Sequence, residues 1–201
     1  MKINVFKIIK KTKVEGPGTR FCLWVQGCMR RCEGCWAKST WSHKPKTIMT
    51  VDEIFQMIQS QEGIEGVTFL GGEPFEQADA LSVLAEKVQS IGLSVMTFTG
   101  ATFEDLQSVN DEGFVNLLKY TDLLIDGNFQ EEKFDLTRPW VGSKNQRYIF
   151  LSDRYNADDI KKYKNKVEIR IDKNGFIFVN GMADFSKLKS NLKLLVPEKS
   201  I

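Results

Sequence analysis

The sequence predicts an α/β fold, an open, partial βα barrel that carries a small C-terminal hairpin and helix. Apolar runs of strand length alternate with stretches whose apolar residues recur at helical spacing. Repeated strand–helix units of this kind imply parallel strands joined by right-handed crossovers. A closed eightfold barrel takes about 250 residues, whereas the chain has 201. We therefore expect an open barrel or a twisted parallel sheet.

The first expected unit is a strand, a cysteine-rich loop and a helix. Residues 21–26 are apolar enough for a buried strand that runs directly into the loop. Thr50 is expected to cap the helix, because Glu53 three residues later completes a capping box. Residues 66–70 form the next expected strand.

The middle of the chain repeats this alternation. Between Pro74 and Gly92 the apolar residues fall on one helical face, and a glycine just after such a run is typical of a helix end. Residues 93–98 then predict a strand, residues 103–120 a mostly helical segment, and residues 123–125 a further strand.

The end of the chain predicts an addition to the fold. Residues 147–151 and 167–171 have strand composition, and a turn after the latter leads into an expected strand at 176–179, which makes a hairpin. Residues 184–195 have the pattern of a short amphipathic helix. We expect residues 1–150 to form the core and residues 151–201 an extension packed on the same domain. The extension either completes the core, covers the open side of the barrel or binds a substrate.

Three of the four cysteines form a C-x3-C-x2-C triplet, Cys28, Cys32 and Cys35. Three thiolates this close can hold three irons of a [4Fe-4S] cube and leave the fourth iron open for chemistry, whereas electron carriers supply four protein ligands. The alternative is a structural zinc site that recruits Cys22, although such sites pair two short cysteine corners across a longer loop. Cys22 lies within the first expected strand, so a small buried apolar side chain is its simpler role.

Composition sets further bounds. Four cysteines in 201 residues are too few for a disulfide framework, and closely spaced free thiols indicate a reducing cytoplasm. The net charge of +2 creates no field that favours nucleic acid. No apolar stretch approaches the length of a membrane span, so we expect no membrane partner. His43, the single histidine, lies in a polar loop and is expected to be exposed.

Polar residues beside glycine follow three successive expected strands. Ligands of parallel α/β folds bind at the carboxyl ends of the strands. Gly71, Gly72 and Glu73 follow one strand, so that the glycines allow close backbone approach with exposed amides and the glutamate offers an acceptor for an ammonium group. Thr99 and Asp126 end the next two strands, each before a glycine.

In its cysteine triplet and in the turn formed by Gly71, Gly72 and Glu73, the chain resembles the radical S-adenosylmethionine enzymes. The likeness is greatest to the small activating enzymes of glycyl radical proteins, above all the anaerobic ribonucleotide reductase activases. It covers about residues 15–155 and rests on five runs: E-G-P-G-T-R, G-C-M-R-R-C-E-G-C-W, G-G-E-P, D-G-N-F and G-S-K-N-Q-R. Trp36 and Ala37 depart from the Tyr-Asn or Phe-Asn that commonly follows the last cysteine in this family.

The resemblance implies a fold of radical SAM type and a set of site residues. Cys28, Cys32 and Cys35 would ligate a [4Fe-4S] cluster whose free iron is chelated by S-adenosyl-L-methionine. The expected contacts of that cofactor are Gly71, Gly72, Glu73, Thr99, Asp126, Arg147 and Trp36. Two of these have alternatives, since Arg147 could instead pair with an acid in the wall of the fold and Trp36 could be ordinary core.

The resemblance also implies an activity. The reduced cluster would cleave S-adenosylmethionine to a 5′-deoxyadenosyl radical, which abstracts a hydrogen from a glycine of a partner glycyl radical enzyme. A flavodoxin- or ferredoxin-type protein is the expected reductant. One alternative is a radical enzyme that modifies a small molecule or a peptide, with the C-terminal extension closing the site. A second alternative is a module that is not an enzyme and binds zinc or transfers electrons.

Overall fold

The centre of the molecule is a seven-stranded mixed sheet. The computed structural model describes residues 1–175 and 177–184. Within them the strand order is β3-β1-β2-β4-β5-β6-β7. The strands are β1 Lys2–Thr12, β2 Arg20–Val25, β3 Thr47–Thr50, β4 Gly66–Gly71, β5 Ser94–Phe98, β6 Leu123–Asp126 and β7 Arg147–Phe150.

Four neighbouring strands, β2, β4, β5 and β6, are parallel, as the alternation of strands and helices predicts. The outer strands β1, β3 and β7 are antiparallel to their neighbours, which corrects the expectation of a wholly parallel sheet. The mixed α/β class is confirmed, and closure of the sheet into a partial barrel stays a prediction.

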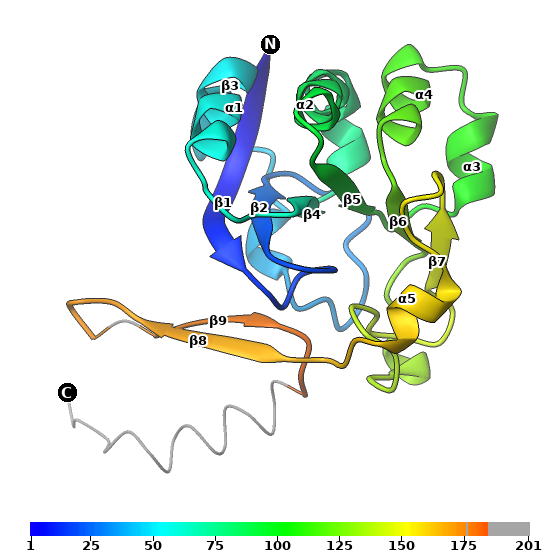
Figure 1. Cartoon of the computed structure of the whole chain (residues 1–201). Helices are drawn as coiled ribbons and strands as arrows, with labels where there is room; N and C mark the ends of the chain where they lie inside the picture. The colour runs from blue at the N-terminus through cyan, green and yellow to red at the C-terminus, as the bar shows by residue number, and fades with distance from the viewer. Residues whose placement is uncertain (176, 185–201) are drawn as a thin grey trace.

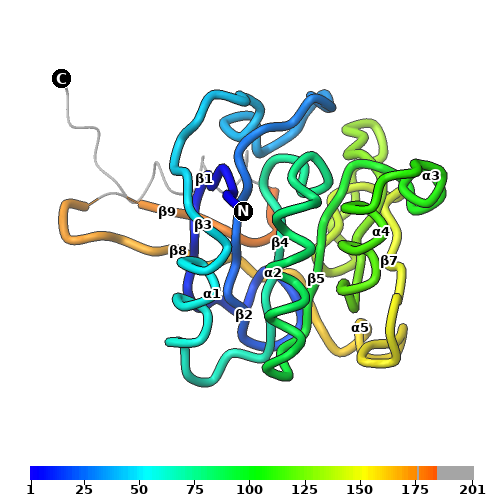
Figure 2. The backbone as a smooth tube through the Cα atoms, turned by 90° about the horizontal axis from the view of Figure 1, so that it is seen from above, coloured from blue at the N-terminus to red at the C-terminus, as the bar shows by residue number. Residues whose placement is uncertain are grey.

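The helices of the alternating units cover one face of the sheet (Figure 1). They are α1 Val51–Gln59, α2 Ala78–Ser90, α3 Phe103–Ser108 and α4 Glu112–Lys119, with short 3-10 turns at Lys38–Thr40, Pro74–Gln77 and Glu131–Lys133. Figure 2 shows α1, α2 and α4 side by side. None of the helices in the described part of the chain is long and apolar enough to span a membrane.

Alternation along the parallel strands divides the apolar side chains between the two faces of the sheet, and the described residues form three apolar clusters. Phe21, Leu23 and Val25 of β2 are fully buried beneath the helices in the largest core. Cys22, between the first two of these, is also fully buried but packs in a separate small core with Ile9. This two-residue period is that of a strand covered on both faces, and it confirms the expected burial of Cys22.

Local signals of the sequence are confirmed at the two helix ends that they predict. The Thr50 hydroxyl accepts a hydrogen bond from the Glu53 amide at 3.2 Å, and the Glu53 carboxylate accepts from the Thr50 amide at 2.7 Å. Gly92 follows α2 with a φ of 81°, in the left-handed region that glycine favours.

The mostly helical segment expected over residues 103–120 is confirmed, and it consists of two helices. It is divided into α3 and α4 because Val109 has an extended backbone and Asp111 caps a new helix, accepting a hydrogen bond from the Phe114 amide at 2.9 Å. The sequence did not predict β1, whose alternation is broken by lysines, nor β3 or the short helix α5 Ala157–Lys161.

The C-terminal part of the described chain forms a separate antiparallel hairpin, β8 Val167–Ile171 and β9 Ile177–Gly181. The hairpin lies on the side of the sheet opposite the helices (Figure 1). The strand expected at 167–171 is confirmed, and the second strand runs two residues beyond its expected end. The helix expected at 184–195 lies outside the described residues except for Asp184, and the division into a core and an extension stays a prediction.

Candidate cofactor site

The cysteine triplet lies on a loop that follows β2 and closes on itself. The Gly27 amide donates to the Thr40 carbonyl at 2.7 Å, and the Cys28 amide donates to the Trp41 carbonyl at 3.3 Å. Compact loops with adjoining ends of this kind form stable surface structures. The loop therefore keeps all three cysteines at the carboxyl end of β2.

Glu76, from the turn before α2, fixes the base of this loop. One carboxylate oxygen accepts a hydrogen bond from the Met29 amide at 2.7 Å, and the other lies 2.6 Å from His43 Nε2. His43 is exposed, as expected, but it takes part in this pair. The loop is thus attached to the segment that follows β4.

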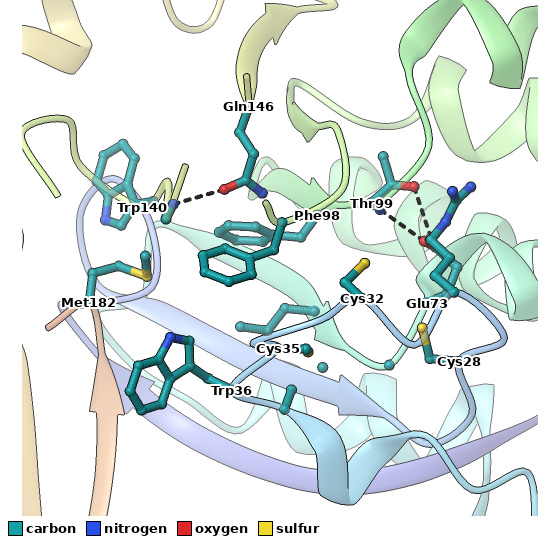
Figure 3. A pocket seen from close by; sticks show the side chains of 18 of the residues that line it. Cys28, Cys32, Cys35, Trp36, Glu73, Phe98, Thr99, Trp140, Gln146 and Met182 are labelled. Carbon is teal, nitrogen blue, oxygen red and sulfur yellow. Dashed lines mark hydrogen bonds and ion pairs between the residues drawn. The ribbon is translucent and has the colours of Figure 1, made fainter. Parts of the chain in front are cut away.

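All three cysteines line one cavity of about 260 Å³ at the carboxyl ends of the parallel strands (Figure 3). The cavity also contains most of the other residues that the sequence singles out: Trp36, Gly71, Gly72, Glu73 and Thr99. Its remaining walls include Glu15, Phe98, Trp140, Gln146 and Met182. The structure therefore brings the triplet and the G-G-E-P turn together, as the topology predicts.

The arrangement of the thiols suits a multi-iron group better than a single ion. A zinc ion holds its thiolate ligands about 2.3 Å from one point. Among the described residues no three His, Cys, Asp or Glu side chains converge in that way, although three cysteines share one cavity. Cys22, the fourth ligand that zinc would need, is fully buried within β2 and does not line the cavity. Three cysteines that line one cavity fit an iron–sulfur cluster.

Two of the three thiols of the triplet have a raised pKa, which favours the protonated form. Burial raises the pKa of Cys28, although the amides of Arg30 and Arg31 oppose the shift. Burial also raises the pKa of Cys32, and the nearby Cys35 adds to the increase. Binding of a metal group at these positions therefore releases protons.

Glu73 is a buried carboxylate held by four donors. One oxygen accepts from the Thr99 hydroxyl at 2.9 Å and from the Phe75 amide at 3.2 Å, while the other accepts from the Gly100 amide at 2.9 Å and from Arg30 Nε at 3.0 Å. Burial raises its pKa, and the Gly100 amide and Arg30 oppose this. Arg30 is the exposed member of the ion pair, with 38% of its side chain accessible. A ligand ammonium can therefore take the place of this guanidinium.

The glycines of the turn serve the cysteine loop rather than presenting free amides. A Cβ atom at Gly72 would lie 2.1 Å from the Gly27 carbonyl oxygen, so only glycine permits this close packing. The Gly72 amide donates to the Val25 carbonyl at 2.9 Å, and the Glu73 amide donates to the Gly27 carbonyl at 2.8 Å. For Gly72 the expectation of an exposed amide is wrong, because this amide already has a backbone acceptor.

Asp126 and Arg147 do not line the cavity, although their chain neighbours Gly127 and Gln146 do. Arg147 Nε donates to Asp126 at 3.0 Å, and a terminal nitrogen of Arg147 lies 2.6 Å from Glu104. Asp126 is fully buried and also accepts from the Phe103 amide at 2.8 Å. Of the two expected roles of Arg147, the structure shows pairing with an acid of the wall. Contacts of either residue with a cofactor stay predictions.

Trp36 is 55% exposed and lines the cavity, so the alternative that it is ordinary core is wrong.

The sequence analysis assigned no role to several other residues that line the cavity. Glu15 lies in the E-G-P-G-T-R run and is 6% exposed. This motif could therefore have been used to predict a residue of the cavity wall. Trp140 and Met182 reach the cavity only through tertiary packing, and no local pattern marks them.

Comparisons with known proteins agree with this site. The model of the family described as "4Fe-4S single cluster domain" matches residues 14–149. An anaerobic ribonucleoside-triphosphate reductase-activating protein of Enterobacteria phage T4 is 33% identical over 151 residues, which cover 72% of this chain and 92% of that protein. A protein of the same name from Vibrio cholerae serotype O1 is 34% identical over 66% of this chain and 88% of its own length. The corresponding protein of Escherichia coli (strain K12) is 31% identical over 66% of this chain and 89% of its own.

Proposed function

This chain belongs to the 4Fe-4S single cluster domain family together with the anaerobic ribonucleoside-triphosphate reductase-activating proteins, and we propose that it activates a glycyl radical enzyme of the anaerobic ribonucleotide reductase type. The observation that carries the proposal is the gathering of Cys28, Cys32, Cys35 and Glu73 on one cavity. The near-complete coverage of the T4 relative supports the same activity.

In this proposal the three cysteines hold a [4Fe-4S] cluster and leave one iron for S-adenosylmethionine. When bound, the cluster and S-adenosylmethionine supply a 5′-deoxyadenosyl radical, which takes a hydrogen atom from a glycine of the partner. A flavodoxin- or ferredoxin-type protein supplies the electron. The radical SAM type of open barrel is part of the same proposal.

The chain's own residues bind and orient these groups. Glu73, held by its three other donors, receives the ammonium group of the methionine moiety in place of Arg30, beside Gly71 and Gly72. Thr99 and Trp36 line the same space, whereas Asp126 and Arg147 act from the wall through their ion pair. Aromatic walls such as Phe98 and Trp140 exclude water from the reacting groups.

The proposal is tested with the chain, its reductase partner, S-adenosylmethionine and dithionite under anaerobic conditions. We expect a glycyl radical signal in the electron paramagnetic resonance (EPR) spectrum of the partner, together with release of 5′-deoxyadenosine. Cys28→Ala should lose both products, since it removes a cluster ligand, and Cys22→Ala should retain both. Full activity of Cys28→Ala, or no glycyl radical with the unaltered chain, contradicts the proposal.

One observation favours a second candidate, a radical enzyme that modifies a small molecule or a peptide. Gly181, Met182 and Ala183 at the end of the hairpin line the cavity, as expected if the extension closes the site over a small substrate. In that case deoxyadenosine release depends on a small substrate, and no partner glycine acquires a radical.

A further inference from the structure

The hairpin β8–β9 is an addition to the matched family region. The family model ends at residue 149, and the hairpin begins at Val167. In Figure 1 it crosses the side of the sheet that the helices leave uncovered. It is therefore an element whose role the family does not define.

The hairpin is attached to β1 and the segment after it by specific contacts. The Thr12 hydroxyl donates to Glu168 at 2.6 Å, and the Asn180 side-chain amide donates to the Thr12 hydroxyl at 3.2 Å. The Gly181 amide donates to the buried Glu15 carboxylate at 2.7 Å. These bonds hold the end of β9 at the cavity.

The end of the hairpin forms the wall of the cavity that lies opposite Cys28 and Glu73. Figure 3 shows Cys28 and Glu73 at one end of the cavity and Met182 at the other, between Trp140 and Trp36. The Met182 amide donates to the Lys166 carbonyl at 3.0 Å, which fixes the backbone from which this side chain projects. Since Cys28 and Glu73 lie at the first end, we assign the second end to the substrate, beside Trp36, which the cofactor and the substrate share.

We propose that Met182 determines substrate specificity by closing the substrate end of this cavity between the two tryptophans. The inference rests on the proposed function. A methionine side chain is flexible and packs well against aromatic rings, so it yields to an entering backbone loop and otherwise keeps water out. The favoured substrate is a glycine-bearing segment of a partner, and Met182 limits cleavage of S-adenosylmethionine when that segment is absent.

Two variants open this wall, and a third is a matched control. Met182→Ala removes the side chain itself. Gly181→Ala places a Cβ 2.2 Å from the Lys166 carbonyl oxygen, at a φ of 101°, and so displaces the end of β9. Gly175→Ala makes the same change at a φ of 83° in the hairpin turn, where a Cβ meets nothing within 4 Å. The control therefore carries a similar backbone strain without a change in the cavity.

Two measurements are made on the full-length chain. The first is the number of glycyl radicals formed per deoxyadenosine released, with the reductase partner and dithionite. The second is the rate at which iodoacetamide alkylates Cys32 and Cys35 before the cluster is loaded. We expect Met182→Ala and Gly181→Ala to lower the first ratio and raise the alkylation rate, each on the order of threefold, while Gly175→Ala resembles the unaltered chain.

An unchanged ratio and an unchanged alkylation rate in Met182→Ala overturn the inference. If Gly181→Ala does not fold, as judged by circular dichroism, the Met182→Ala result decides alone. Release of deoxyadenosine by the unaltered chain without any glycyl radical refutes the proposed function instead. The inference is then judged by alkylation and by the rate of deoxyadenosine release without a partner, which Met182→Ala should raise.

Discussion

Glu15 shows how one buried residue links the cavity wall to the stability of the molecule. Burial raises its pKa from 4.5 to about 7, with the negative charge of Glu168 adding to the shift and the Gly181 amide, Asn180 and Lys7 opposing it. The carboxyl group therefore holds a proton in the folded chain at pH values where the unfolded chain has lost it.

This shift predicts a pH dependence of stability. Between pH 4.5 and about 7 the folded state binds more protons than the unfolded state at Glu15, so the free energy of unfolding falls as the pH rises through this window and levels off above it. Over the whole window the free energy of unfolding decreases by about 3 kcal/mol. Urea unfolding of the unaltered chain and of Glu15→Gln at pH 5 and pH 8 measures it. Identical pH dependence of the two proteins contradicts the account.

At single positions, the sequence predicted the residues whose chemistry is local. The spacing of the cysteine triplet and the placement of Glu73 after a strand sufficed to place both at one site. The partners of Arg147 were left open between a cofactor and an acid, because its contact with Glu104 depends on where α3 lies relative to β7. Met182 was not predicted at all, since its position depends on how the hairpin docks.

The cysteine loop is the element that joins the sheet to the cofactor site. Its two ends are closed by backbone bonds between Gly27 and Thr40 and between Cys28 and Trp41. Glu76 adds a side-chain bond to the Met29 amide. These contacts hold the loop that carries the three cysteines against the sheet and the segment after β4.

Removal of the Glu76 anchor should weaken retention of the cluster. Glu76→Ala replaces the acceptor of the exposed Met29 amide by water, and a typical hydrogen bond contributes about 0.5–1.5 kcal/mol, so iron loss to a chelator should be several-fold faster. His43→Ala is the control, because it removes the imidazole and keeps the bond from Met29. Equal rates of iron loss in Glu76→Ala and the unaltered chain argue against this role.

Elements were predicted where their signals lie within a few residues. The Thr50 capping box and the glycine after α2 were sufficient for two helix ends. Strand β1 was not predicted, because its alternation of buried and exposed positions is interrupted in the middle, where three successive residues are half-buried. The direction of β7 depends on the route of the preceding loop, which local sequence does not encode.

Arg20 connects distant parts of the whole molecule. It is fully buried at the start of β2 and donates to Thr68 at 2.7 Å, to the Ser94 hydroxyl at 2.9 Å and to the Tyr155 hydroxyl at 3.3 Å. Its contacts thus join β2, β4 and β5 to the segment after β7. The E-G-P-G-T-R run therefore contributes to the integrity of the sheet as well as to the cavity.

Loss of this network should destabilise the entire chain. Arg20→Met leaves several buried acceptors without a donor, and we expect the free energy of unfolding to fall by about 3 kcal/mol or more. Tyr155→Phe removes only the hydroxyl and should cost about 1 kcal/mol. Urea unfolding compares the two variants. A loss in Arg20→Met no larger than that in Tyr155→Phe contradicts the assignment.

The central claim for the whole molecule is that three cysteines hold an iron–sulfur cluster with one iron left for S-adenosylmethionine. The most direct test measures iron and zinc in anaerobically purified protein and records the EPR spectrum of the reduced protein with and without S-adenosylmethionine. We predict about four irons per chain, no stoichiometric zinc, and a cluster signal that changes when S-adenosylmethionine is added. One zinc per chain, or a cluster signal that S-adenosylmethionine leaves unaltered, contradicts the claim.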